Sequence, residues 1–210
     1  MFQIKRIFDL ATPGEKRGME EVQQIFRKVF TGVPEYADKL PELLVGREKG
    51  YDFILLTAEK SKDKVLGFAL LHYYSDLGYG YLDFIASDPD CRASGIGGAL
   101  YEAVREYLDR KGAKGLLMEV PPDDPALVAD PTFLPLNRQR LKFYEQYGAF
   151  PIWGTKYETL PDDAPVPYDP PYLLFDPLGH SKPLPKADAK RVVQAILVRE
   201  NFTMPQPFGA

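Results

Sequence analysis

The stretch YLDFIASDPDCRASGIGGAL, residues 81–100, says more about the fold than any other part of the chain. Its first seven residues are mostly apolar and suit a strand, and its end opens an amphipathic helix that stops at Gly112. Gly95, Gly97 and Gly98 stand where this helix begins. Glycines there let a ligand approach the backbone, and the free N–H groups of the first helical turn bind anions such as phosphate. The stretch predicts a strand, an anion-binding turn and a helix.

Two common phosphate-binding motifs fit this turn poorly. A P-loop needs Gly-Lys-Ser/Thr, which is missing here. A dinucleotide fold needs G-x-G-x-x-G after a tight turn, but position 100 is leucine and seven residues separate Ser87 from Gly95. Glu119 does stand where a ribose-binding acid would. An NAD(P)-binding oxidoreductase therefore remains an alternative, as does a turn whose glycines only pack the helix against a sheet.

Apolar periodicity places further elements along the chain. Strands are predicted at 2–9, 52–58, 64–74, 79–87, 115–120, 150–158 and 172–176. Helices are predicted at 18–30, 36–44, 96–108, 138–146 and 187–199. Helices between strands indicate an α/β fold. We expect one domain over 1–210, with a core over about 1–178 and a helical extension over 179–210.

Composition narrows the class of protein. The 210 residues are 45% hydrophobic, which suffices for a packed core, and the net charge of −4 disfavours nucleic acid or an anionic membrane as partner. One cysteine excludes a disulfide framework, and two histidines far apart in sequence, His72 and His180, argue against a metal site. The stretch MFQIKRIFDL is too short and too alternating for the apolar core of a signal peptide, and no stretch approaches the roughly 20 apolar residues of a membrane span. We expect a cytoplasmic protein.

Two motifs together resemble the GNAT superfamily of N-acetyltransferases. The Arg-x-x-Gly-x-Gly pattern of residues 92–97, directly before a helix, resembles the family's acetyl-CoA pyrophosphate loop, and residues 85–89 resemble the strand end before it. Asn137, seven residues before Tyr144 in FYEQYGAF, is similar to the family's second signature. The resemblance implies a GNAT-type acyl-CoA N-acyltransferase fold. Its central sheet is mixed, mostly antiparallel, flanked by helices and splayed at the acetyl-CoA site.

The resemblance also implies roles for individual residues toward acetyl-CoA as co-substrate, with no metal. Ile85 and Ser87 would lend backbone groups to the pantetheine arm, and Asn137 would bond it. Tyr144 would donate a proton to the departing CoA thiolate. The pyrophosphate would be held by Arg92, Ala93, Ser94, Gly95, Ile96, Gly97 and Gly98.

An amine acceptor makes a further demand. Its pKa lies near 10, so a base must remove a proton before the nitrogen attacks the thioester. Glu119, at the end of a central strand, is the first candidate and corresponds to a glutamate of ribosomal-protein N-terminal acetyltransferases. Asp83, on the neighbouring strand, is the second, and either residue could instead be an ordinary strand-end acid. Cys91 lacks a nearby histidine, which favours direct transfer in a ternary complex over an acyl-cysteine.

The segment after the fifth strand suggests the acceptor. Residues 121–136 form an insertion relative to compact family members, and residues 115–137 contain four acids and no lysine or arginine. The acids are Glu119, Asp123, Asp124 and Asp130. Such a loop would attract a cation with a hydrocarbon stem, such as a polyamine or a free or peptide lysine. Similarity of residues 137–152 to acetyltransferase domains joined to acetylpolyamine-deacetylase-like proteins points the same way.

Several alternatives stay open. The acidic loop could be solvated or belong to a homodimer contact, and the C-terminal helix could cap the sheet or exchange with a second subunit. A non-catalytic acyl-CoA-binding or sensing module would keep the glycine turn but lack the chemistry. The presence of Asn137, Tyr144 and Glu119 favours an enzyme over such a module.

Overall fold

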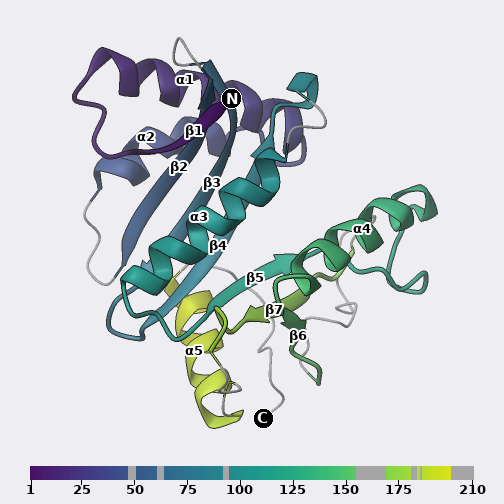
Figure 1. Ribbon diagram of the computed structural model, residues 1–210. Coiled ribbons are helices and arrows are strands. Elements are labelled where there is room, and N and C mark those ends of the chain that lie inside the picture. The colour runs from purple at the N-terminus through teal and green to yellow at the C-terminus, as the bar shows by residue number, and fades with distance from the viewer. Residues whose placement is uncertain are drawn as a thin grey trace. The chain divides into compact units, whose positions relative to one another are not determined.

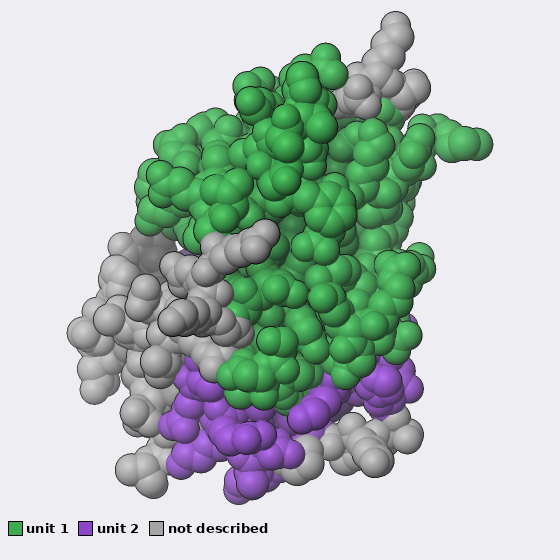
Figure 2. All heavy atoms as spheres, turned by 90° about the vertical axis from the view of Figure 1, so that its left-hand side faces the viewer, with its two compact units in different colours: residues 1–113 green, residues 114–210 purple. Residues whose placement is uncertain are grey.

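A computed structural model describes residues 1–46, 51–60, 64–91, 95–154, 169–180, 184 and 186–199, the last four without their side chains. The chain divides into two compact units, residues 1–113 and 114–210, which Figure 2 distinguishes by colour. Each unit is treated by itself below. The single domain expected over 1–210 stays a prediction.

The first unit contains a four-stranded antiparallel sheet and three helices (Figure 1). Each strand pairs with the next one along the chain. The strands are β1 (Phe2–Ile7), β2 (Asp52–Lys60), β3 (Lys64–Tyr74) and β4 (Tyr79–Ser87). The helices are α1 (Pro13–Val29), α2 (Tyr36–Val45) and α3 (Ile96–Arg110), with a short 3-10 helix at Pro89–Cys91.

Both faces of this sheet are covered, which explains the almost continuous apolar runs of β2 and β3. Phe53 and Leu55 of β2 join the core formed with α1 and α2. Ile54 and Leu56 are also buried and, because successive side chains of a strand alternate, they point to the opposite face. Helix α3 contacts β2, β3 and β4. A strand covered on both sides loses the polar alternation of a half-exposed strand.

Helix α1 begins five residues earlier than the predicted start at 18. Thr12 and Glu15 form a capping box in which the Glu15 N–H donates to Thr12 Oγ1 at 3.2 Å and the Thr12 N–H donates to Glu15 Oε2 at 3.2 Å. Pro13 stands at the first helical position, where its missing N–H costs nothing. The helix therefore begins at Pro13, and the predicted start at 18 was too late.

The end of α3 lies close to the predicted stop. Gly112 has a positive φ of 68°, and its N–H donates to the Asp109 carbonyl at 2.8 Å. The Ala113 N–H donates to the Leu108 carbonyl at 3.0 Å. This pair of bonds is a Schellman motif, which satisfies the last carbonyls of the helix and needs a left-handed residue.

The second unit contains three strands in the order β5-β7-β6, all antiparallel. The strands are β5 (Leu116–Val120), β6 (Phe150–Pro151) and β7 (Tyr172–Asp176). The helices are α4 (Leu134–Glu145) and α5 (Lys186–Arg199), with a 3-10 helix at Pro131–Phe133. Helix α4 starts before the predicted 138, with a proline in its first turn. The predicted strand over 150–158 is described only as far as residue 154, and two residues of that part are extended as a strand.

The order of strands and helices confirms the predicted α/β class with a mostly antiparallel sheet flanked by helices. Every strand pair described above is antiparallel. Among the helices of the described segments, none has the length and apolar character needed to cross a bilayer. The apolar face predicted for α5 is covered, because Ala189, Val192 and Val193 are buried.

Gly67 of β3 offers a test of how closely β3, β4 and α3 pack. A Cβ at this position would meet the Ala86 carbonyl oxygen at 2.6 Å, Ile96 Cγ2 at 2.8 Å and Ser87 Cα at 3.0 Å. Gly67→Ala should therefore destabilise the protein by about 1–3 kcal/mol, as overpacking does. Urea unfolding measures the change, with Gly32→Ala as control, since nothing lies within 4 Å of its Cβ position. Equal midpoints for both variants would contradict the close packing.

Candidate active site

The glycine turn joins β4 to α3 in the first unit. Gly95 caps α3 with φ 67° and ψ 15°, a left-handed conformation that favours glycine, and no side chain caps this end of the helix. An ideal Cβ at Gly95 or Gly97 has no heavy atom of the described structure within 4 Å. The first turn of α3 thus presents backbone N–H groups beside open space, as an anion site requires. Arg92, Ala93 and Ser94 lie outside the described residues.

The position of this turn is fixed by the core behind it. Ile96, the first residue of α3, is 2% exposed and packs where β3 has a glycine, Gly67. The register of β3 and β4 sets Gly67 opposite Ser87, at the end of β4. Ser87 is exposed and Ile85 is half-buried. Their predicted backbone contacts with pantetheine remain a prediction.

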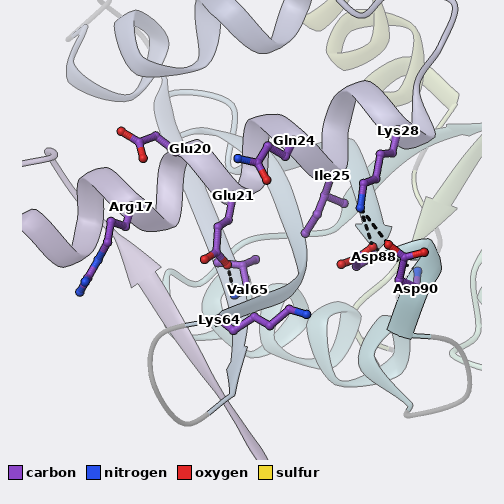
Figure 3. A pocket seen from close by; sticks show the side chains of 10 residues that line it. All are labelled: Arg17, Glu20, Glu21, Gln24, Ile25, Lys28, Lys64, Val65, Asp88 and Asp90. Atoms are coloured by element: carbon purple, nitrogen blue, oxygen red, sulfur yellow. Dashed lines mark hydrogen bonds and ion pairs between the residues drawn. The ribbon is translucent and has the colours of Figure 1, made fainter.

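Lys28 of α1 holds the segment that leads into the turn (Figure 3). Its Nζ lies 3.4 Å from Asp88 Oδ1 and 3.0 Å from Asp90 Oδ2. The bond to Asp90, and then the charge of Asp88, raise the pKa of Lys28. The Asp88 N–H donates to the Leu66 carbonyl at 2.8 Å. Asp88 is thus held by Lys28 through its side chain and by Leu66 through its backbone. Nothing in the sequence had marked Lys28 as part of the site.

A cavity of about 500 Å³ beside this contact has mixed charge. Seven of its lining residues are charged: Arg17, Glu20, Glu21, Lys28, Lys64, Asp88 and Asp90. Figure 3 shows Lys28 turned toward Asp88 and Asp90 rather than into free space. Four carboxylates among three cations do not favour an anion, so we assign this cavity no part in binding a phosphate group.

Asp83 lies at an irregularity of β4. Leu70 of β3 pairs with Phe84 and Leu71 pairs with Leu82, so Asp83 is the extra residue of a β-bulge. Its Oδ2 accepts a hydrogen bond from the Tyr36 hydroxyl at 3.1 Å. The Asp83 side chain is 12% exposed. The sequence indicated Asp83 as a candidate base but gave no sign that Tyr36 would contact it.

Glu119, Asn137 and Tyr144 belong to the second unit, where α4 contacts β5. Glu119 stands on β5 opposite Leu173 of β7 and is half-buried. Asn137 and Tyr144 share one face of α4 with Leu141, and all three are buried. Helical spacing of four and three residues puts them on that face.

The two polar residues of this face differ in how they are satisfied. Asn137 is 2% exposed and its Nδ2 donates to the Pro122 carbonyl at 2.8 Å, which ties α4 to the segment after β5. Burial raises the pKa of Tyr144 to about 12, and the nearby Arg140 charge opposes this shift. Tyr144 therefore keeps its proton throughout the neutral range, where it can give a proton but does not act as a phenolate base.

Three acids accept hydrogen bonds from backbone N–H groups of the insertion, Asp124 and Asp130 within their own turns and Asp169 from a distant part of the sequence. Asp124 Oδ1 accepts from the Ala126 N–H at 2.9 Å, and Asp169 Oδ1 accepts from the Ala129 N–H at 2.8 Å. Asp130 Oδ1 accepts from the N–H and hydroxyl of Thr132, which lowers the pKa of Asp130. These carboxylates thus shape the loop through hydrogen bonds from backbone N–H groups. Within the described ranges, no group of His, Cys, Asp and Glu is placed to hold a metal ion.

Comparisons with known proteins give a family and a fold. Residues 19–129 match the model of the acetyltransferase (GNAT) family. A search of curated protein sequences finds no match. The family match ends before Asn137 and Tyr144, so those two positions rest on their motif alone.

Solved structures of acetyltransferases are similar in fold. A GNAT-family acetyltransferase from Desulfovibrio desulfuricans is 20% identical, with a TM-score of 0.61 over 85% of this chain and 99% of that one. An aminoglycoside 6'-N-acetyltransferase complexed with coenzyme A is 15% identical, with a TM-score of 0.59 over 86% and 99%. The ribosomal-protein-S18-alanine N-acetyltransferase of Escherichia coli is 17% identical, with a TM-score of 0.51 over 87% and 97%. Identities this low show the fold alone.

The raised pKa of Tyr144 predicts how stability changes in alkali. The folded protein holds this proton more tightly than the unfolded chain, whose tyrosine titrates near 10. The contribution of the protonated Tyr144 to the free energy of unfolding is fully present below pH 10. It falls as pH rises toward 12, by up to about 1.4 kcal/mol per pH unit. Urea unfolding from pH 9 to 11 should show the wild-type free energy of unfolding falling relative to Tyr144→Phe above pH 10. A constant difference would contradict a buried phenol.

Proposed function

The chain belongs to the acetyltransferase (GNAT) family, as its motifs predict, and we propose that it transfers the acetyl group of acetyl-CoA directly to a primary amine in a ternary complex. The observation that carries this proposal is the start of α3. Gly95 adopts a left-handed conformation there, no side chain caps the helix, and the space at Gly97 is open. The N–H groups of that turn suit the pyrophosphate of acetyl-CoA.

The residues proposed to bind acetyl-CoA fit its chemistry. Residues 92–98 would hold the pyrophosphate through backbone N–H groups, and Ile85 and Ser87 would pair with the pantetheine amides as a strand does. One N–H of the Asn137 side chain donates to the Pro122 carbonyl. Its carboxamide has a second N–H and an oxygen, which suit a pantetheine amide.

In this proposal a carboxylate acts as the base and Tyr144 acts as the proton donor. A carboxylate, Glu119 or Asp83, takes a proton from the acceptor ammonium so that the nitrogen can attack the thioester carbonyl. Tyr144 donates its O–H to the sulfur as the C–S bond breaks. Its pKa of about 12 lies above the value near 8.5 of a free thiol. Tyr144 therefore stabilises the leaving thiolate as a hydrogen-bond donor before any complete transfer.

We propose a small cationic amine, such as a polyamine, or the amine of lysine or a peptide, as acceptor. Residues 115–137 carry four acids without a lysine or arginine. Asp124 and Asp130 accept hydrogen bonds from the backbone of their own turns, and the bonds from Thr132 lower the pKa of Asp130. A negative loop of this kind attracts polycations over a Debye length.

Titration calorimetry tests the binding half of the proposal. The protein should bind acetyl-CoA in the micromolar range, with NAD(P)H as the control ligand. Gly97→Leu should weaken acetyl-CoA binding at least tenfold, because its side chain enters the open space beside the turn. Gly32→Leu, whose Cβ position is equally open, should bind as the wild type does. A folded protein that binds NAD(P)H and not acetyl-CoA would overturn the proposed function.

Steady-state kinetics with a panel of amines test the catalytic half. Tyr144→Phe should lower kcat about 10²-fold or more while the Kd of acetyl-CoA changes less than twofold, since the hydroxyl acts only in the chemical step. Tyr147→Phe, in the turn that follows α4, is the matched control and should keep wild-type turnover. Full activity in Tyr144→Phe would show that the assigned donor is wrong. Tight binding of acetyl-CoA with no turnover on any amine would indicate a sensing module instead.

A further inference from the structure

The bulge at Asp83 turns this carboxylate toward the α2 side of the sheet. Successive residues of a regular strand point to opposite faces, yet Asp83 and Phe84 both meet Tyr36. The Tyr36 hydroxyl lies 3.1 Å from Asp83 Oδ2, and its ring centroid lies 5.2 Å from that of Phe84. The extra residue in β4 therefore brings a charged side chain to a face that is otherwise aromatic.

Tyr36 is held firmly where it meets the carboxylate. It is the first residue of α2, and its ring stacks on that of Phe26 at 5.8 Å with an interplanar angle of 20°. Phe26 is fully buried in the core. A hydroxyl on a ring fixed by packing is a preorganised donor, which costs little to orient.

His72 approaches the same oxygen from β3. Its Nε2 lies 3.9 Å from Asp83 Oδ2, and the residue is 1% exposed. Its ring stacks on Tyr51 at 5.0 Å with an interplanar angle of 20°, and the Tyr74 hydroxyl lies 3.5 Å from Nδ1. His72 therefore brings its Nε2 edge close to Oδ2, at a distance longer than a hydrogen bond.

We propose that Asp83 is the group that takes the proton of the acceptor ammonium and that His72 and Tyr36 are its positioning residues. This inference rests on the proposed function. Both contacts fall on Oδ2, where the Tyr36 hydroxyl donates at 3.1 Å and His72 Nε2 lies at 3.9 Å. They fix the orientation of the Asp83 carboxylate, and the hydrogen bond from Tyr36 favours its ionised form.

The proton balance of the reaction has a place for such a base. The ammonium loses one proton to the Asp83 carboxylate, and the nitrogen attacks the thioester carbon. As the C–S bond breaks, the Tyr144 hydroxyl gives its proton to the sulfur, which ends as a thiol, and takes up the second nitrogen proton in its place. Asp83 then returns its proton to water. No oxidant or further reactant is needed.

The groups around Asp83 and His72 make a pH profile informative. The titratable neighbours with described contacts are Tyr36 of α2, Tyr51 before β2 and Tyr74 of β3, with the Tyr81 ring of β4 6.4 Å from that of His72. Tyrosine ordinarily titrates near pH 10. An acid limb of kcat well below that pH therefore does not come from these tyrosines.

The experiment compares variants on the amine that the panel identifies, from spermidine, lysine and a lysine peptide. Asp83→Asn should lower kcat at least 10²-fold with the Kd of acetyl-CoA unchanged, and Glu119→Gln should lower it less than tenfold. His72→Phe keeps the stacked ring and should lower kcat about tenfold. It should also shift the acid limb to higher pH, because a carboxylate ionises less readily beside an apolar ring edge than beside an imidazole. Tyr73→Phe, the next residue on β3, is the control and should match the wild type.

Three results would overturn this assignment. Full activity of Asp83→Asn with loss in Glu119→Gln would make Glu119 the base and leave the proposed function standing. A slower His72→Phe with an unmoved acid limb would reduce His72 to a core residue. If His72→Phe does not fold, Tyr74→Phe and Tyr36→Phe replace it in the experiment. An acid limb of kcat that stays at the wild-type pH in both variants would equally overturn the assignment. If the wild-type protein neither binds acetyl-CoA nor acetylates any amine, the proposed function itself is wrong. That result is obtained before any variant is made.

Discussion

The first turn of α3 can lie against β3 because residue 67 has no side chain. A Cβ there would stand 2.6 Å from the Ala86 carbonyl oxygen and 2.8 Å from Ile96 Cγ2, distances that a packed core does not permit. Ile96 fills the space and is 2% exposed. The helix start is thus set by the core rather than by its own sequence. The left-handed Gly95 and the open N–H groups then take their positions from it.

Burial also sets the chemistry of α4. Leu141 anchors the helix, and the same face carries Asn137 and Tyr144 into a poorly hydrated environment. Desolvation disfavours the phenolate, so Tyr144 stays protonated near neutral pH and can give a proton there. Asn137 is tolerated in this environment because Pro122 accepts one of its protons. A substitution that exposed this face would therefore change both the pKa of Tyr144 and the bond from Asn137 to the segment after β5.

Most elements were predictable from local signals, and the errors have identifiable causes. The strands of the first unit and the stop at Gly112 follow from periodicity and from a glycine in a left-handed turn. Helix α1 was placed too late because Pro13 can either end a segment or begin a helix. Only the contacts of Thr12 with Glu15 decide between the two. Similarly, α4 begins before the predicted position, with a proline in its first turn.

The sequence by itself determined the family, the glycine turn and the presence of carboxylates and a tyrosine suited to acyl transfer, since these depend on residue type and spacing. Tertiary structure alone decided which side chains meet. Tyr36 and His72 are 36 residues apart in the numbering, and they meet at Asp83 only because a bulge in β4 turns that carboxylate toward α2. No local pattern encodes such a meeting. Register, bulges and burial arise from contacts between segments distant in sequence.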